Sequence, residues 1–146
     1  MSTVIQAIRH FSILRKRIFL TADSIVEDEN GAILFIKRKT EPFKGHWGLP
    51  GGFVKYREEV ETAAVREVKE ETGIDVRLRG LHGVYSKFGR DPRGHVVTVC
   101  FVADKTGGAL RTSRETTEVK FLAEIPTMLA FDHSEILQSY LKSKIP

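Results

Sequence analysis

The amino-acid sequence predicts an α+β fold in which a mixed β-sheet lies between helices. Short apolar segments bounded by turn residues occur before and after the middle of the chain, which is typical of strands. Two longer segments show the apolar spacing of helices, one in the middle of the chain and one near its end. The order of strands, helix, strands and helix favours a sheet covered by helices. A length of 146 residues is enough for one core.

The first two strands form a predicted hairpin. Residues 18–26 and 32–38 are strand-like, and the segment between them ends in Asn30-Gly31. Asn-Gly adopts the positive φ angles that tight turns require. The next segment, 41–52, is rich in glycine and proline, so we expect a loop with a short strand at its end.

The helices are predicted from spacing and end signals. A helix over 58–72 has Gly73 at the position of a C-cap. The last helix is expected over 133–143. Asp132 precedes it and Glu135 follows three positions later, which is the spacing of a capping box. The remaining segments are expected to be strands at 76–85, 95–103 and 118–123, a turn at 86–94 and a loop at 104–117.

Residues 1–17 differ from the rest and form an N-terminal extension, while 18–146 form one domain without repeats or linkers. Val4, Ile8 and Phe11 follow helical spacing loosely, and a basic cluster follows them at 15–17. We expect an amphipathic segment that packs on the domain or on a second copy of the chain. Binding of nucleic acid or of a membrane surface is the weaker interpretation, because the segment is short.

Composition narrows the class of protein. A net charge of +4 suits an anionic ligand, although it is also an ordinary charge for a soluble domain. The chain has one cysteine, Cys100, so a reducing, cytoplasmic location is expected. No apolar run reaches the roughly 18 residues of a membrane span, and the N-terminus does not have the apolar region of a signal peptide.

Three carboxylates lie close together on the helix over 58–72. At about 100° per residue, Glu67 and Glu71 are about 40° apart and Glu70 is about 60° from Glu67. They share one face beside an apolar stripe formed by Val60, Ala64, Val65 and Val68. Negative charge near a helix C-terminus is unfavourable. A hard divalent cation with oxygen ligands, such as Mg²⁺, would offset this cost.

A solvated helix is the alternative, because Arg66 and Lys69 can neutralise two of the glutamates. The preceding residues favour the metal site instead. Gly51-Gly52 follows a short strand, and paired glycines allow close approach of the backbone to a metal or ligand. Gly52 can offer its carbonyl oxygen as a further ligand.

The combined spacing is G-x5-E-x7-R-E-U-x-E-E-x-G-U, where U is aliphatic, running from Gly52 through Glu58 to Ile74. This pattern resembles the signature of Nudix hydrolases at every fixed position. The resemblance implies an α/β/α sandwich with a mixed sheet. It also implies hydrolysis of a nucleoside diphosphate linked to another group, with Mg²⁺ as cofactor and Mn²⁺ as its substitute.

The resemblance assigns roles to the residues of the motif. It implies Gly52, Glu67, Glu70 and Glu71 as metal ligands. Arg66 would orient the carboxylates, and Glu58 would support them from near the helix start. The general base differs among family members, and the candidates here are Glu67 and, in the loop before the 118–123 strand, Glu115.

Three further segments resemble the ADP-ribose pyrophosphatase branch of the family: 85–86, 91–95 and 129–133. The implied reaction converts ADP-ribose to AMP and ribose 5-phosphate. The branch often has a proline about fifteen residues after the motif, where this chain has Phe88. Two alternatives therefore stay open: hydrolysis of a nucleoside triphosphate, including an oxidised one, and non-catalytic sensing of a nucleotide sugar. Relatives often form homodimers, which 1–17 would support.

The substrate side is predicted from exposed aromatic and basic residues. Trp47 and Phe88 can stack on a base, although large aromatics more often belong to the core. Arg90 and Arg93 can meet phosphate or ribose. Asp132 is expected to be a helix N-cap, and recognition of the base is the alternative role. The histidines His95 and His133 are expected to be structural.

Overall fold

A computed structural model describes residues 16–144 of the chain. The amphipathic extension expected over 1–17 therefore lies outside the described residues, apart from residues 16 and 17. The elements are the strands β1 (Ile18–Glu27), β2 (Ile33–Arg38), β3 (Trp47–Gly48), β4 (Gly51–Phe53), β5 (Ile74–Tyr85), β6 (His95–Gly108) and β7 (Thr116–Leu122), and the helices α2 (Val60–Thr72) and α3 (His133–Ser143).

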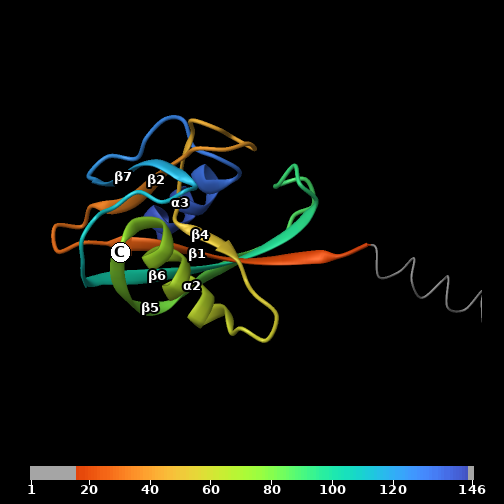
Figure 1. Cartoon of the computed structure of the whole chain (residues 1–146), viewed down its shortest axis with the longest axis horizontal. Coiled ribbons are helices and arrows are strands. Elements are labelled where there is room, and N and C mark those ends of the chain that lie inside the picture. Colours follow the sequence, from red (N-terminus) through yellow and green to blue (C-terminus); the bar gives the residue numbers. More distant parts are fainter. Residues whose placement is uncertain (1–15, 145–146) are drawn as a thin grey trace, which may run out of the picture.

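The strands form one sheet in the order β3-β2-β1-β6-β5, with β4 paired to β1 and β7 paired to β2 (Figure 1). β1 and β6 are parallel from Ile18↔His95 to Glu27↔Asp104. The other pairs are antiparallel. The sheet is therefore mixed, as the sequence predicts.

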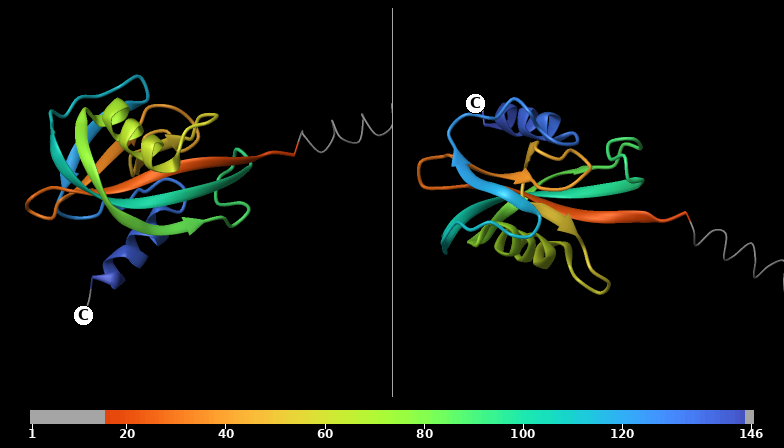
Figure 2. Two further views of the ribbon diagram at one scale, coloured as in Figure 1. Left: turned by 90° about the horizontal axis from the view of Figure 1, so that it is seen from below. Right: turned by 45° about the horizontal axis from the view of Figure 1, so that its top comes forward.

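The two helices cover opposite faces of the sheet, which Figure 2 shows most clearly in its right-hand view. Successive side chains of β1 point to opposite faces. Ile25 packs in one core with Ile136 of α3, whereas Val26 packs in another with Val68 of α2. The expected α/β/α sandwich is confirmed.

Several boundaries differ from the sequence-based expectations, as in β5, which begins at Ile74 and not at 76. β6 continues to Gly108, because its polar end stays paired with the start of β5, as in Ile74↔Gly108. β7 begins at Thr116, so both ends of the expected loop over 104–117 are strand. α2 begins at Val60 and leaves Glu58 in the preceding turn, where its Oε1 accepts the Lys55 N–H at 3.0 Å.

The expected capping box of α3 is wrong. Asp132 is at the N-cap position but makes no side-chain cap hydrogen bond. Its carboxylate instead accepts two hydrogen bonds from Arg90, at 2.6 and 2.8 Å. The ion pair with a residue 42 positions away replaces the local cap.

The buried stripe of α2 also differs in one position. Val65 is 37% exposed, whereas Ala63 is buried with Ala64 and Val68. The buried face of α2 is therefore turned slightly relative to the face expected from the sequence, and it includes Glu71. Within residues 16–144, no helix is both long enough and apolar enough to cross a membrane.

Candidate metal and active site

The second half of α2 faces the glycine turn, residues 49–52, whose two glycines begin β4. The Gly51 N–H donates a hydrogen bond of 3.1 Å to Glu71 Oε1. A Cβ atom on Gly52 would lie 2.5 Å from Glu67 Cδ. Only glycine therefore lets the backbone approach the helix this closely. The turn and the helix carboxylates form one unit.

Arg66 connects four parts of this unit. Its guanidinium donates hydrogen bonds to Glu58 at 2.7 and 2.8 Å, to Glu67 at 2.8 Å and to Glu70 at 3.1 Å. It also donates to the Phe53 carbonyl oxygen at 3.2 Å. A planar guanidinium suits this role because its five donors have fixed directions. Arg66 and its three glutamate partners are thus joined directly, and the Gly51 N–H holds Glu71, the fifth charged residue at a fixed position of the motif.

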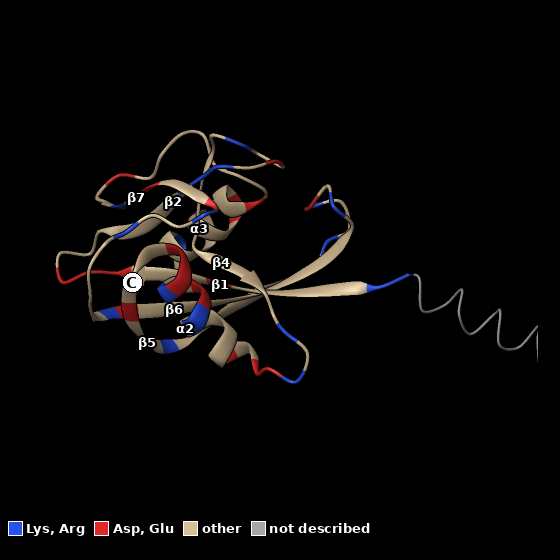
Figure 3. Cartoon of the chain, viewed as in Figure 1, with Lys and Arg blue, Asp and Glu red and all other residues tan. Residues whose placement is uncertain are grey.

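The charged residues of α2 appear as red and blue bands along the helix in Figure 3. The carboxylates differ in burial and therefore in acidity. Glu71 is 5% exposed, and burial followed by the charge of Glu67 raises the pKa of its carboxyl. Hydrogen bonds from Arg66 and then from the Lys55 backbone lower the pKa of Glu58 to about 2. Glu58 is thus a fixed anion that anchors Arg66, while burial disfavours the charged form of Glu71.

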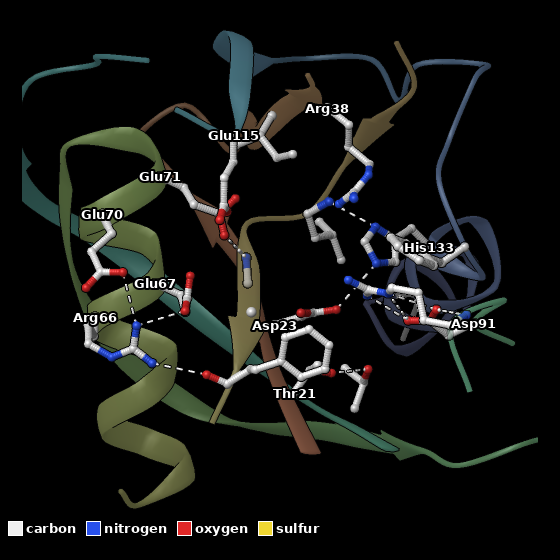
Figure 4. Close-up of a pocket in the computed structure, with 18 of the residues that line it drawn as sticks. Thr21, Asp23, Arg38, Arg66, Glu67, Glu70, Glu71, Asp91, Glu115 and His133 are labelled. Carbon is white, nitrogen blue, oxygen red and sulfur yellow. Dashed lines mark hydrogen bonds and ion pairs between the residues drawn. The ribbon is translucent and has the colours of Figure 1, made fainter. Parts of the chain in front are cut away.

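A cavity of about 380 Å³ opens over this cluster (Figure 4). Glu67, Glu70 and Glu71 line one wall from α2, and Glu115 reaches the same cavity from the loop before β7. Figure 4 shows Glu115 and Glu71 pointing toward each other. The loop glutamate therefore lies beside the helix carboxylates although it is 44 positions from Glu71 along the chain.

The opposite wall is basic and aromatic. The guanidinium of Arg93 lies 4.9 Å from the Phe53 ring and 5.3 Å from the Phe131 ring. Arg38 lies 5.1 Å from the same Phe131 ring and donates to the Pro42 carbonyl oxygen at 2.6 Å. Burial and then the charge of Arg93 lower the pKa of Arg38. An anion bound between these two cations and the acidic wall would stabilise both of them.

Four residues expected on the substrate side do not line this cavity. Arg90 and Asp132 pair with each other, with side chains 5% and 13% exposed. Trp47 packs against the core under α3, with Lys37 5.6 Å from its ring. Phe88 is 74% exposed and lies beside His95, at the rim of a neighbouring depression that also includes Arg93.

Several residues of the cavity were not expected from the sequence. Arg38 ends a buried strand between two other basic residues, so its neighbours hide it. Asp23, Thr21 and Thr98 lie on the cavity floor. A carboxylate within the apolar strand β1 was the available signal for Asp23, which is 7% exposed. Phe131 has a φ of 53°, a left-handed conformation that the sequence does not indicate.

The oxygen-rich donors fit a hard divalent cation. Among residues 16–144, no three His, Cys, Asp or Glu side chains converge as a closed metal cage. Mg²⁺ takes oxygen ligands, carboxylates among them, and keeps several of its waters. The buried charge of Glu71, disfavoured beside Glu67, is the specific observation that a cation would offset.

A mixed sheet between two helices, with a carboxylate-bearing helix over a double-glycine turn, defines the class of metal-dependent α/β/α hydrolases. Residues 18–140 match the NUDIX domain model. The chain belongs to the NUDIX family, and its expected assignment as a Nudix-type hydrolase is confirmed. Members of this family use divalent metal ions.

Similar proteins support this assignment. An ADP-ribose pyrophosphatase from Methanocaldococcus jannaschii is 48% identical over 127 residues, which are 86% of this chain and 74% of that protein. The NUDIX domain of Shewanella oneidensis NrtR, solved in complex with ADP ribose, has a TM-score of 0.77 and 26% identity, over 98% of this chain and 99% of that one.

A third similar protein was solved with a metal ion. It is a bifunctional NMN adenylyltransferase/ADP ribose pyrophosphatase from Francisella tularensis, solved with AMP and a Mn ion. Its TM-score is 0.77 at 26% identity, and the match covers 96% of this chain and 46% of that chain.

Proposed function

We propose that this chain hydrolyses ADP-ribose to AMP and ribose 5-phosphate and uses Mg²⁺, with Mn²⁺ as a substitute. The observation that carries the proposal is the cavity itself, in which an acidic wall faces two arginines. A pyrophosphate carries negative charge on both phosphates, so it suits a site with metal ligands on one side and cations on the other. The similarity to ADP-ribose pyrophosphatases supports this choice of substrate.

We assign the metal to Glu67, Glu70, Glu71 and the Gly52 carbonyl oxygen. When bound, a divalent ion neutralises phosphate charge and lowers the pKa of a coordinated water. Arg66 keeps Glu67 and Glu70 in place through its hydrogen bonds, and Glu58 in turn fixes Arg66. Arg66 and Glu58 therefore act by positioning and do not need to touch the substrate.

Two carboxylates can accept the proton of the attacking water. Glu67 reaches the cavity from α2 and Glu115 from the loop before β7. A positioned general base contributes about 10²- to 10⁴-fold to a rate. Arg66 already donates a hydrogen bond of 2.8 Å to Glu67 Oε1, so that oxygen has a partner within the motif. This contact favours Glu115 as the base and Glu67 as a metal ligand.

On the substrate side, we propose Arg93 and Arg38 as the groups that hold the phosphate farther from the metal. Arg93 is fixed by the Asp91 carboxylate at 2.8 Å and by the two phenylalanine rings. Phe88, at the rim, remains a proposed stacking partner for the base. Trp47 remains a weaker one because it packs on the core. Arg90 and Asp132 support this side through their ion pair, because Arg90 belongs to the same loop as Arg93.

The direct test incubates the purified full chain with ADP-ribose and Mg²⁺ and follows the products by chromatography. We expect AMP and ribose 5-phosphate in equal amounts, and no turnover in EDTA. Pyrophosphate release from nucleoside triphosphates, with ADP-ribose inert, would instead assign a triphosphate substrate. Calorimetric binding of ADP-ribose without any product would assign a sensor.

We also propose a homodimer. Apolar side chains are exposed at the outer end of β1 and beside it: Ile18 is 65% exposed, Phe19 46% and Phe53 40%. Contiguous exposed apolar surface of this kind often marks a protein–protein interface. Light scattering of the full chain at micromolar concentration should give about twice the chain mass of 16.5 kDa. A mass of one chain at all concentrations would rule the dimer out.

A cytoplasmic location is proposed on the basis of the cysteine content. Cys100 is the single cysteine of the chain and is fully buried in the core, as a free thiol. Burial raises the pKa of its thiol, so it is an inert core residue. A chain without an intrachain disulfide suits a reducing compartment.

A further inference from the structure

We propose that His133 and Asp23 are positioning residues for the metal site, so that the start of α3 sets how tightly the glycine turn binds the ion. This inference rests on the proposed metal site at Gly52 and the α2 carboxylates. The chain segment before α3 lies beside β3, and the contacts that support the inference begin there.

The segment before α3 pairs with β3 as a short parallel ladder. Trp47 bridges Leu129, its N–H donates to the Met128 carbonyl oxygen at 2.8 Å, and its carbonyl oxygen accepts the Ala130 N–H at 2.8 Å. In a regular parallel ladder, the next N–H of β3 would donate to the carbonyl oxygen of Ala130. That donor is Leu49, two residues after Trp47.

The ladder ends because the chain turns into the helix. Phe131 adopts a φ of 53°, and the carbonyl oxygen of Ala130 accepts the His133 N–H at 3.1 Å instead. The buried Leu49 N–H donates to His133 Nδ1 at 3.0 Å. The imidazole therefore replaces the missing backbone acceptor. Without it, Leu49 would keep a buried donor unsatisfied.

The hydrogen bond to Leu49 also fixes the other side of the ring. Because Nδ1 accepts a hydrogen bond, the proton of the neutral ring is on Nε2. Nε2 lies 3.3 Å from Asp23 Oδ2. Figure 4 shows the ring of His133 and the Asp23 carboxylate pointing toward each other from the two sides of the cavity floor. The ring thus has a defined partner on each nitrogen.

Asp23 continues the connection into the glycine turn. It is the register partner of Gly51 in the β1–β4 pair, and its carboxylate fills the place that a Gly51 side chain would take. The next residue of β1, Ser24, donates its N–H to the Pro50 carbonyl oxygen at 3.0 Å. The backbone from Leu49 to Gly52 is therefore held by His133, by β1 and by Glu71.

His133 and Asp23 are not themselves assigned as metal ligands, yet their contacts hold the backbone that carries the Gly52 carbonyl oxygen. A shift of the Leu49 backbone would move that oxygen relative to Glu67. Residues that orient metal ligands typically change metal affinity 10- to 100-fold when they are replaced. His133 has this supporting role through its contact with Leu49, and Asp23 has it separately through its place against Gly51.

Two substitutions separate the roles of the ring nitrogens. In His133→Asn, the side-chain oxygen lies near the place of Nδ1 and can still accept the Leu49 N–H. In His133→Gln, the amide extends to the place of Nε2 and reaches Asp23 but leaves Leu49 without an acceptor. Both variants lose the imidazole ring, so each is the matched control for the other.

The readout is Mn²⁺ binding to the substrate-free protein, measured as free Mn²⁺ by electron paramagnetic resonance. We expect His133→Gln to raise the Mn²⁺ dissociation constant about 10-fold or more, and His133→Asn to stay within about 3-fold of the parent. Both should lose similar thermal stability. In kinetics, excess metal should restore the kcat of His133→Gln, while the KM for ADP-ribose stays unchanged.

Equal Mn²⁺ affinity in the two variants, with only melting temperatures lowered, would overturn the inference and leave His133 a structural residue. If His133→Gln does not fold, Gly48→Ala provides the test. A Cβ on Gly48 would lie 3.2 Å from His133 Nδ1 and would displace the ring without removing a polar group. A parent protein that binds no Mn²⁺ would instead contradict the metal site itself.

Discussion

Glu71→Gln is expected to lower kcat by at least about 100-fold and to leave the melting temperature in EDTA unchanged or raised. Glutamine has the size of glutamate, and its carbonyl oxygen can still accept the Gly51 N–H. The substitution removes a charge that is buried beside Glu67, and burial of an uncompensated charge opposes folding. Activity and stability should therefore change in opposite directions, which is typical of a residue that is kept for function.

Steady-state kinetics and thermal melting of the same preparations check this result. Glu61→Gln is the matched control, because Glu61 is exposed in the first turn of the same helix. It should keep both kcat and the melting temperature. Near-normal kinetics in both Glu71→Gln and Glu70→Gln would contradict the assigned metal ligands.

Gly51→Ala is expected to destabilise the fold by about 1–3 kcal/mol and to abolish detectable turnover. The added Cβ would meet the Asp23 carboxylate and would lie 2.6 Å from the Ala22 carbonyl oxygen. The side chain of Asp23 can rotate, but the backbone of β1 cannot move without breaking its pairing with β6. The strand β4 must therefore separate from β1, and the metal-binding turn moves with it.

Urea unfolding and ADP-ribose turnover measure the two effects. Gly80→Ala in β5 is the control, because its Cβ would meet no atom within 4 Å. Gly52→Ala should differ from both: the three atoms nearest to its Cβ would all belong to the Glu67 carboxyl group, so activity should fall more than stability. If Gly51→Ala protein were stable and active, the turn would have room for a Cβ atom, which would contradict this prediction.

Local rules predicted most of the fold because each element has a clear signal. Asn30-Gly31 marks the hairpin, and Gly73 ends α2 with a φ of 79° as a C-cap should. The end of β6 was missed because it is polar. Asp104 and its neighbours are held by cross-strand pairing and by an ion pair with Arg79, and neither depends on apolar alternation.

The acidic half of the site was predictable because it lies within one motif. Helical spacing alone places Glu67, Glu70 and Glu71 on one face, and Arg66 is adjacent. The basic half combines residues from β2, from the loop before β6 and from the start of α3. Arg38 and Phe131 are 93 positions apart, so no local pattern joins them. Only the folded sheet brings them together.

The ion pair between Arg90 and Asp132 has a consequence for how this protein can diverge. Each side chain is almost completely buried. Replacing one partner alone would leave a buried charge uncompensated, at a cost of about 3–5 kcal/mol. Positions 90 and 132 should therefore covary among related chains. Arg90 belongs to the loop that carries Arg93, and Asp132 lies at the start of α3. We therefore expect substrate preference to change among relatives only when both segments change together.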